Sequence, residues 1–485
     1  MRVSIPTNHN YYEEAPLIED QLKKEFEVKS LKKITSLFSS TFELTTKSAN
    51  LKQIQIFDFK NQQNKLENDE QLILKLFSKE NGEKGKKYII QTGLFSGVVF
   101  HNGCQFNITS AYGDTFLKRM LNSINDIYID TQEDKASKSS ETNEFQNILA
   151  FLFIQSLEKA AVLGLPKAYQ QQTQRSHKVR GKVDINAYLK HDFPFQGKLT
   201  TIFREQVYTQ EIIDILFLAC KKLEHNFGKA IHKKILGIYQ LLKQNYSGTY
   251  ADHATIEKAK NHSVLHNPMF ATFKQVLSYA EIILKEQSMV SHNKDNSHVT
   301  HGYLFDISQL FEVYLEKLIS RHFSDWFVTS QEELYVYNDM FFNRRMFPDL
   351  LMRHKETDHV IVLDAKFKKM RGEGRDVDRS DFYQIHSYIQ YYQPDVLFGG
   401  LIYPFSEQID PTKSHSSSLY GSSPQKTKFI LDGIYINEKM TMQNIINSEN
   451  EFLSRVEGLI DDRTQPSPSA PSYSHNTVQV LHSPQ

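Results

Sequence analysis

The spacing of apolar and polar residues changes along the chain and separates three regions. Residues 1–140 mix charged helical stretches with strand-like alternation, which is clearest over residues 87–110, and this mixture predicts a β-rich or α+β domain. From Asn143 apolar residues recur every three or four positions, so residues 141–300 are predicted to be mainly helical. The polar residues 288–303 are predicted to form the linker to the third region.

The third region, residues 301–462, alternates helical and strand-like patterns. It opens with a predicted helix whose wide apolar stripe contains Leu304, Phe305, Leu310, Phe311, Tyr314, Leu315 and Leu318. One further helix is predicted at residues 378–392. Strands are predicted at residues 333–337, 345–353, 359–367, 396–404 and 428–436. This order predicts a sheet with flanking helices, and the whole chain is predicted to be an α+β multidomain protein.

Composition narrows the protein class. Of the 485 residues, 40% are hydrophobic and 24% are charged, as in globular proteins with packed cores. The 57 basic and 57 acidic residues cancel, so no whole-molecule charge attracts nucleic acid, although local basic patches can. The Pro/Ser-rich residues 463–485 predict a disordered tail.

Cysteine usage and hydropathy point to a cytoplasmic protein. Cys104 and Cys220 are the only cysteines, and their spacing excludes a disulfide framework and a cysteine-rich zinc site. No apolar run reaches the roughly 18 residues that a spanning helix needs. We therefore expect no membrane segment and a reducing compartment.

Two acids and one lysine stand among strand-forming residues of the third region. Asp364 and Lys366 are two positions apart on one predicted strand, so their side chains project from the same face. If residues 345–353 form the neighbouring strand, Asp349 can face Asp364 across the ladder. Two carboxylates would then converge near one lysine.

Buried like charges are costly unless a cation lies between them, and oxygen ligands favour Mg²⁺. Lys366 would hold or help to deprotonate the attacking water, or stabilise charge on a phosphate. The pattern predicts metal-dependent phosphodiester hydrolysis. Taken singly, Pro-Asp is also a common turn dipeptide, and Asp-x-Lys is also a solvated charge pair.

A run of basic residues follows the strand. Such a run suits a flexible loop that contacts DNA phosphates or, alternatively, only aids solubility. The DNA-contact candidates in this run are Lys368, Lys369, Arg371 and Arg375.

The motifs of the third region resemble a known family. "FPD" with "DAK" is the signature of the PD-(D/E)xK nuclease superfamily, and Gln384 with Tyr388 is similar to the QxxxY element of its RecB-like members. The segments "LFDISQLFEVYLEKLI", "RRMFPDLL", "VIVLDAKFK" and "DFYQIHSYIQYY" resemble the C-terminal half of McrC proteins, the nuclease subunits of McrBC-type modification-dependent restriction systems. The segment "HKVRGKVDINAYL" resembles the VRG-containing region of that family. The resemblance covers about residues 93–438, and residues 1–90 match nothing known.

This resemblance implies a nuclease α/β core with a mixed sheet in residues 301–462, with Asp349 and Asp364 as Mg²⁺ ligands and Lys366 as the catalytic lysine. Gln384 and Tyr388 would support the site or contact the DNA. Glu312 stands where related nucleases sometimes place another acid, and it is equally an ordinary surface residue of a long helix.

The resemblance also implies an anti-phage restriction activity on double-stranded DNA, with or without a base modification. Because the chain has no GxxxxGK[ST] motif, a separate McrB-like AAA+ GTPase would bind the nucleotide. This chain would cut DNA and stimulate the GTPase, which residues 1–140 could contact.

Two other functions remain open. The chain could be a non-enzymatic activator or scaffold of an NTPase ring, in which the nuclease fold is structural, or a stand-alone nuclease that acts on RNA or structured DNA. The presence of Asp349, Asp364 and Lys366 together favours the restriction nuclease.

Overall fold

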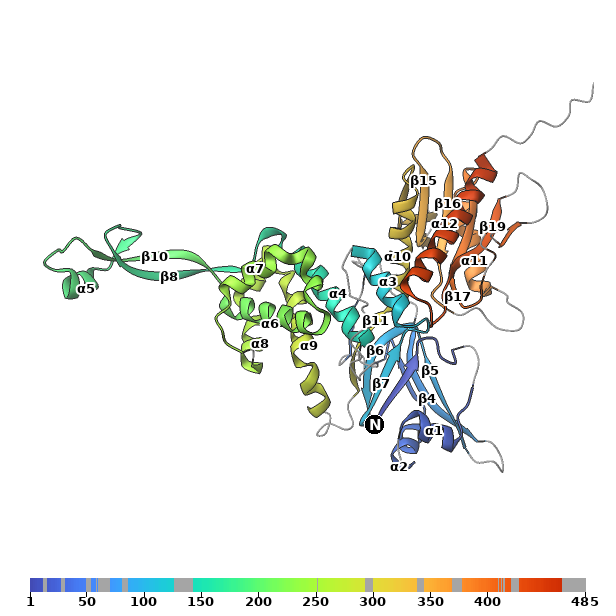
Figure 1. Ribbon diagram of the computed structural model, residues 1–485, viewed down its shortest axis with the longest axis horizontal. Helices are drawn as coiled ribbons and strands as arrows, with labels where there is room; N and C mark the ends of the chain where they lie inside the picture. Colours follow the sequence, from blue (N-terminus) through green and yellow to red (C-terminus); the bar gives the residue numbers. More distant parts are fainter. Residues whose placement is uncertain are drawn as a thin grey trace, which may run out of the picture. The chain divides into compact units, whose positions relative to one another are not determined.

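The chain folds into two compact units, Met1–Lys317 and Leu318–Gln485, and both mix helices with strands (Figure 1). This mixture confirms the predicted α+β class. The computed structural model describes residues 1–11, 15–27, 31–48, 54–57, 59, 70–80, 86–125, 143–250, 252–292, 300–337, 344–368, 377–408, 410, 412, 415–419 and 427–464.

Two sheets form the β-rich part of the first unit. The larger sheet has the order β1-β7-β6-β11-β3, with β1 at Arg2–Pro6, β7 at Cys104–Thr109, β6 at Phe95–His101, β11 at His301–Asp306 and β3 at Ile54–Phe57. The smaller, antiparallel sheet contains β2 (Phe42–Thr45), β4 (Leu72–Glu80) and β5 (Lys86–Thr92). Two short helices accompany the sheets, α1 (Glu19–Glu25) and α2 (Lys32–Thr35).

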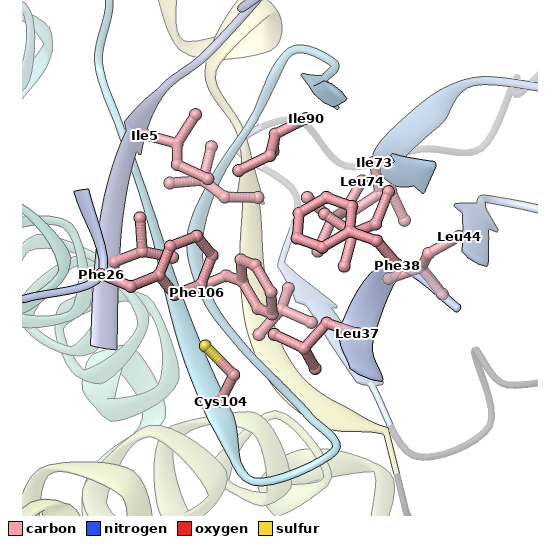
Figure 2. Packing of buried hydrophobic residues seen from close by; sticks show 14 of the residues in the cluster. Ile5, Phe26, Leu37, Phe38, Leu44, Ile73, Leu74, Ile90, Cys104 and Phe106 are labelled. Carbon is pink, nitrogen blue, oxygen red and sulfur yellow. The ribbon is translucent and has the colours of Figure 1, made fainter. Parts of the chain in front are cut away.

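One apolar core joins the two sheets and the short helices (Figure 2). The predicted alternation places Cys104, Phe106 and Ile108 of β7 in this core, because side chains two apart share a face of a strand. Phe26, which follows α1, meets Phe106 edge-on with ring centroids 6.2 Å apart, a favourable aromatic geometry. Cys104 and Cys220 are buried and free.

The helical part of the first unit comprises α3 (Asp114–Asn125), α4 (Asn143–Ala160), α6 (Gln210–Phe227), α7 (Leu236–Asn245), α8 (His253–Lys260) and α9 (Phe273–His292). Every residue from 148 to 154 of α4 is buried, which requires packing partners on all its sides. Helices α4 and α6 both contact α9. The helical pattern predicted from Asn143 onward is therefore present.

Two long strands within this helical region were missed by the sequence prediction. β8 (Lys167–Ser176) and β10 (Leu199–Tyr208) pair along their whole length and extend away from the helices as an arm (Figure 1). Near the tip are β9 (Lys182–Val183), α5 (Ile185–Ala187) and the π-helical turn η6 (Tyr188–Asp192). β8 reads KAYQQQTQRS and its residues are exposed or half-buried, so it has no apolar period that a pattern could detect.

A six-stranded mixed sheet forms the centre of the second unit, in the order β12-β15-β16-β17-β19-β18. Its strands are β12 (Trp326–Thr329), β15 (Leu350–His354), β16 (Val360–Ala365), β17 (Val396–Phe405), β19 (Lys428–Tyr435) and β18 (His415–Ser418). The central strands β16, β17 and β19 are parallel, and the outer strands run antiparallel to their neighbours. β13 (Leu334–Tyr337) and β14 (Arg344–Met346) form a separate ribbon.

Two helices pack on this sheet, α11 (Arg379–Tyr391) and α12 (Met442–Thr464). Ile385 and Ile389 of α11 are fully buried, and a Cβ at Gly399 of β17 would lie 2.4 Å from Ile389. Glycine therefore allows α11 to approach the sheet closely. A buried ion pair joins α12 to the sheet: Arg455 Nη2 of α12 lies 2.8 Å from Asp432 Oδ1 of β19.

The structure corrects two predicted elements. The helix predicted from Leu304 begins at Ile307 as α10 (Ile307–His322), because Leu304 and Phe305 pair with β3 and β6 in strand β11. The carboxylate of Asp306 accepts hydrogen bonds from the backbone N–H groups of Ser308 and Gln309 and so starts the helix. The strand predicted at residues 345–353 is interrupted between β14 and β15.

The domain division predicted at residues 140, 300 and 462 stays a prediction. The two observed units place residues 301–317 in the first unit, since β11 completes its larger sheet. The predicted tail lies outside the described residues from position 465 onward. Among the helices that the structure describes, none combines the length and apolar character needed to cross a bilayer.

Candidate active site

The interruption between β14 and β15 positions Asp349. β15 and β16 are antiparallel with Leu350 opposite Leu363, so the next step of the ladder places Asp349 opposite Asp364. The backbone N–H of Ala365 donates to Asp349 Oδ2 at 3.0 Å, which ties this carboxylate to the end of β16. The structure thus brings together the two acids that the sequence singled out.

Asp364 is fully buried, and its carboxylate oxygens can still accept hydrogen bonds or bind a cation. Lys366 Nζ lies 2.5 Å from Asp364 Oδ2, but within the described residues neither oxygen of Asp364 accepts a hydrogen bond of ordinary geometry. Burial and the neighbouring charge of Asp349 raise the pKa of Asp364 to about 8, although Lys366 opposes the shift. A buried carboxylate that is paired only with Lys366 among the described donors has room for a further positive charge, which suits a cation site.

Lys366 lies at the centre of a network of side chains. Besides contacting Asp364, its ammonium group lies 3.6 Å from Asp381 Oδ1 and donates to Gln384 Oε1 at 3.0 Å. Burial alone would lower the pKa of Lys366, but the carboxylates of Asp364, Asp349 and Asp381 outweigh it and raise this pKa above its ordinary value. This raised pKa favours the protonated, positively charged form of Lys366.

Gln384 and Tyr388 share one face of α11, as predicted from their spacing. Gln384 Nε2 donates to the Tyr388 hydroxyl at 2.9 Å, and this hydroxyl donates to the backbone oxygen of Phe347 at 3.0 Å. Tyr388 is buried, and its hydroxyl links α11 to the segment that carries Asp349. The two side chains connect Lys366 with the loop before β15.

Replacement of Gln384 by Ala is expected to lower the rate of DNA cleavage by about tenfold or more, because Lys366 loses an oxygen that orients its ammonium group. Thermal stability should change little, since the neighbouring carboxylates still neutralise Lys366. A cleavage time course beside a melting curve measures both effects. Gln390→Ala, at an exposed position of the same helix, is the matched control; equal rates for the two variants would leave Gln384 a packing residue.

Two residues of this network were missed by the sequence prediction. Asp381 is buried, and its Oδ2 lies 2.6 Å from Lys368 Nζ. It precedes Gln384 by three positions on α11, and this helical spacing was a usable signal. Gln331 donates through Nε2 to Asp349 Oδ1 at 3.0 Å, but no local pattern marks a residue so far from Asp349 in the sequence.

The other predicted site residues pair with different side chains, belong to the first unit or lie outside the described residues. Lys368 forms ion pairs with Asp381 and, at 3.9 Å, with Asp378. Glu312 is half-buried on the part of α10 that belongs to the first unit, so its relation to Asp364 stays a prediction. The other three DNA-contact candidates lie outside the described residues, namely Lys369, Arg371 and Arg375.

The donor set fits a hard divalent cation. Asp349 and Asp364 supply carboxylate oxygens at one position, and the described part of the chain holds no group of three or more His, Cys, Asp or Glu residues arranged for a metal. Mg²⁺ suits such a site, because it is usually held by one or two carboxylates and completes its shell with water and phosphate.

The sequence matches a known family. The family described as "McrBC 5-methylcytosine restriction system component" matches residues 63–404, which is more than half of the 485 residues. The chain belongs to this family. The match confirms the family resemblance that was found from the motifs around Asp349, Asp364 and Gln384.

Solved structures of McrBC proteins are similar at low identity. An assembly of Thermococcus gammatolerans McrB AAA+ hexamers with bound McrC contains a chain that is 12% identical, with a TM-score of 0.48 and coverage of 95% of this chain and 100% of that chain. A chain of the Thermococcus gammatolerans McrBC complex is also 12% identical, with a TM-score of 0.30 and coverage of 66% and 88%. No curated protein matches the chain.

Proposed function

We propose that this member of the McrBC family is the DNA endonuclease subunit of a restriction system in anti-phage defence and that it hydrolyses phosphodiester bonds with Mg²⁺. One observation carries the proposal: two buried acids, Asp349 and Asp364, converge with the half-buried Lys366 at the end of β16. The mixed sheet with α11 between two parallel strands fits a PD-(D/E)xK nuclease core.

Asp349 and Asp364 would hold the Mg²⁺ ion. The bound ion would supply Lewis-acid charge that stabilises the phosphate during transfer. The Asp364 carboxylate is paired with Lys366 but accepts no hydrogen bond of ordinary geometry within the described residues, and Asp349 is fixed beside it by Ala365. Phosphate oxygens of the DNA backbone would complete the coordination shell of the ion. The same phosphate oxygens would therefore serve both substrate binding and catalysis.

Lys366 would stabilise negative charge. Its raised pKa favours a protonated ammonium group that holds the attacking water or a phosphate oxygen by a hydrogen bond over a role as a general base. Gln384 and Asp381 anchor the ammonium group from the side of α11. Phosphate contacts by Lys368 would require this lysine to exchange its pairing with Asp381 for the DNA.

The partner would be an AAA+ GTPase that this chain stimulates. The chain has no GxxxxGK[ST] motif, and its family is a component of a restriction system, so nucleotide would be bound by another chain. The family description also makes double-stranded DNA that contains 5-methylcytosine the substrate to test.

Apolar side chains that proteins usually bury are exposed near the tip of the arm. They are Val183, Ile185, Leu189, Phe193 and Phe195. Exposed apolar residues of this kind suit a protein partner.

The isolated chain is expected to cut DNA poorly, and a McrB-like AAA+ GTPase should raise the rate in the presence of GTP. The physical reason is that this chain has no phosphate-binding loop to couple nucleotide hydrolysis to the search for a target. Cleavage of methylated plasmid by the chain alone, by the mixture and by the mixture without GTP measures the effect. Efficient cutting by the chain alone, independent of nucleotide, would indicate a stand-alone nuclease.

A non-enzymatic activator of an NTPase ring is the second candidate, and the exposed apolar side chains of the arm favour it. The two candidates differ in their need for the buried acids. If the chain is only an activator, the Asp364→Asn variant should still stimulate the GTPase, and DNA cleavage by the whole system should be unchanged. A nuclease subunit would retain stimulation but lose cleavage.

A further inference from the structure

The carboxylate of Asp349 is held by two donors from different parts of the second unit. Its Oδ2 accepts from the backbone of Ala365, and its Oδ1 accepts from Gln331 Nε2 at 3.0 Å. A carboxylate with one donor can rotate about its Cβ–Cγ bond, whereas two donors on opposite oxygens define its plane. Gln331 therefore helps to set, together with Ala365, which lone pairs of Asp349 face Asp364.

The backbone of Gln331 adopts a conformation that suits glycine better. Its φ is +55°, in the left-handed region that costs energy for a residue with a Cβ atom. Its backbone N–H donates to the oxygen of Pro348 at 3.0 Å, so Gln331 contacts both residues of the Pro-Asp pair. Glycine would adopt this φ without strain but would carry no amide, and strained residues of this kind gather at functional sites.

We propose that Gln331 is a positioning residue that fixes the Asp349 carboxylate in the orientation needed to bind a divalent cation. This inference rests on the proposed function, because it assigns Asp349 to the cation site. Gln331 would contact neither the DNA nor the cation. It would act through Asp349, and its removal should weaken cation binding before any step of cleavage takes place.

The test is a calorimetric titration of the full chain with Mn²⁺, without DNA or partner, for the wild type, Gln331→Ala and Gln331→Gly. Both variants should lower the cation affinity by about tenfold or more, as is typical when a partner of a metal ligand is lost. The glycine variant relieves the left-handed strain and the alanine variant keeps it. Equal loss of affinity in both would identify the amide, and not the backbone, as the cause.

Three further results complete the test. Gln443→Ala removes another glutamine whose amide donates to a side chain, Asn447, and it should bind Mn²⁺ like the wild type. Asp349→Asn should lose binding; if it binds normally, the assignment of the cation site is wrong. If Asp349→Asn loses binding while either Gln331 variant keeps the wild-type affinity, the cation site stands and the role of the Gln331 amide is overturned. Melting curves identify any variant that fails to fold.

Discussion

Asp364→Asn is expected to abolish DNA cleavage while the second unit stays folded. The substitution keeps the shape of the side chain but removes the charge that would hold Mg²⁺. Loss of a metal that stabilises the transition state by several kcal/mol lowers the rate by about a thousandfold or more. Cleavage of methylated plasmid in the presence of the AAA+ partner, GTP and Mg²⁺ measures this loss. Asp349→Asn should behave in the same way.

Stability against pH provides an independent check on Asp364. Its pKa in the folded, metal-free chain is raised from 3.8 to about 8, so between these values the folded state binds a proton that the unfolded state has released. This contribution to the free energy of unfolding is fully present below about pH 4 and is lost as the pH rises through about 8. Asp364→Asn lacks this dependence and should therefore gain stability relative to the wild type as the pH rises. A constant difference between the two melting temperatures, or normal cleavage by the variant, would contradict the assignment.

Lys366→Met is expected to lower cleavage by about two to three orders of magnitude, as the loss of a group that stabilises transition-state charge does in other enzymes. The substitution keeps much of the buried aliphatic stem and removes only the ammonium group. Cation binding should persist or become tighter, because a positive charge 2.5 Å from Asp364 disappears. Cleavage assays and Mn²⁺ titrations on the same preparation measure the two effects separately.

The Lys366→Met variant should remain folded although it loses one partner of an ion pair. Removal of one partner from a buried ion pair usually destabilises a protein strongly, but Asp364 can take up a proton because its pKa is already raised to about 8. The variant should therefore fold near neutral pH. Lys439→Met, at an exposed position, is the matched control. If Lys366→Met loses cation binding together with cleavage, Lys366 acts mainly as a structural counter-ion.

Geometry within one element was predictable from the sequence. Asp364 and Lys366 lie on the same face of β16 and its extension because strand side chains alternate, and the structure places them in contact. Gln384 and Tyr388 share a face of α11 because they are four positions apart, and they form a hydrogen bond. The apolar stripe of α10 was correct from Leu310 onward, because buried helical faces also repeat locally.

Relations between elements were predicted less completely. The convergence of Asp349 with Asp364 was expected, but from a continuous strand, whereas the chain bends before β15 and the Asp349 carboxylate binds the backbone of Ala365. The partner of the Tyr388 hydroxyl, the backbone oxygen of Phe347, lies 41 residues earlier in the chain. No local pattern contains that information.

The sequence by itself determined the family, the α+β class and the residue types of the candidate site, because composition, motif spacing and the periods of strands and helices are properties of neighbouring residues. Only the tertiary structure decided that Leu304 and Phe305 join a sheet of the first unit, that β8 and β10 form an exposed arm, and that Gln331 and Asp381 complete the network around Asp349 and Lys366. These features depend on strand pairing and on charged side chains that meet across long sequence separations. Such contacts form when each unit folds, and their energy comes from burial and neutralisation of charge rather than from any local preference of the chain.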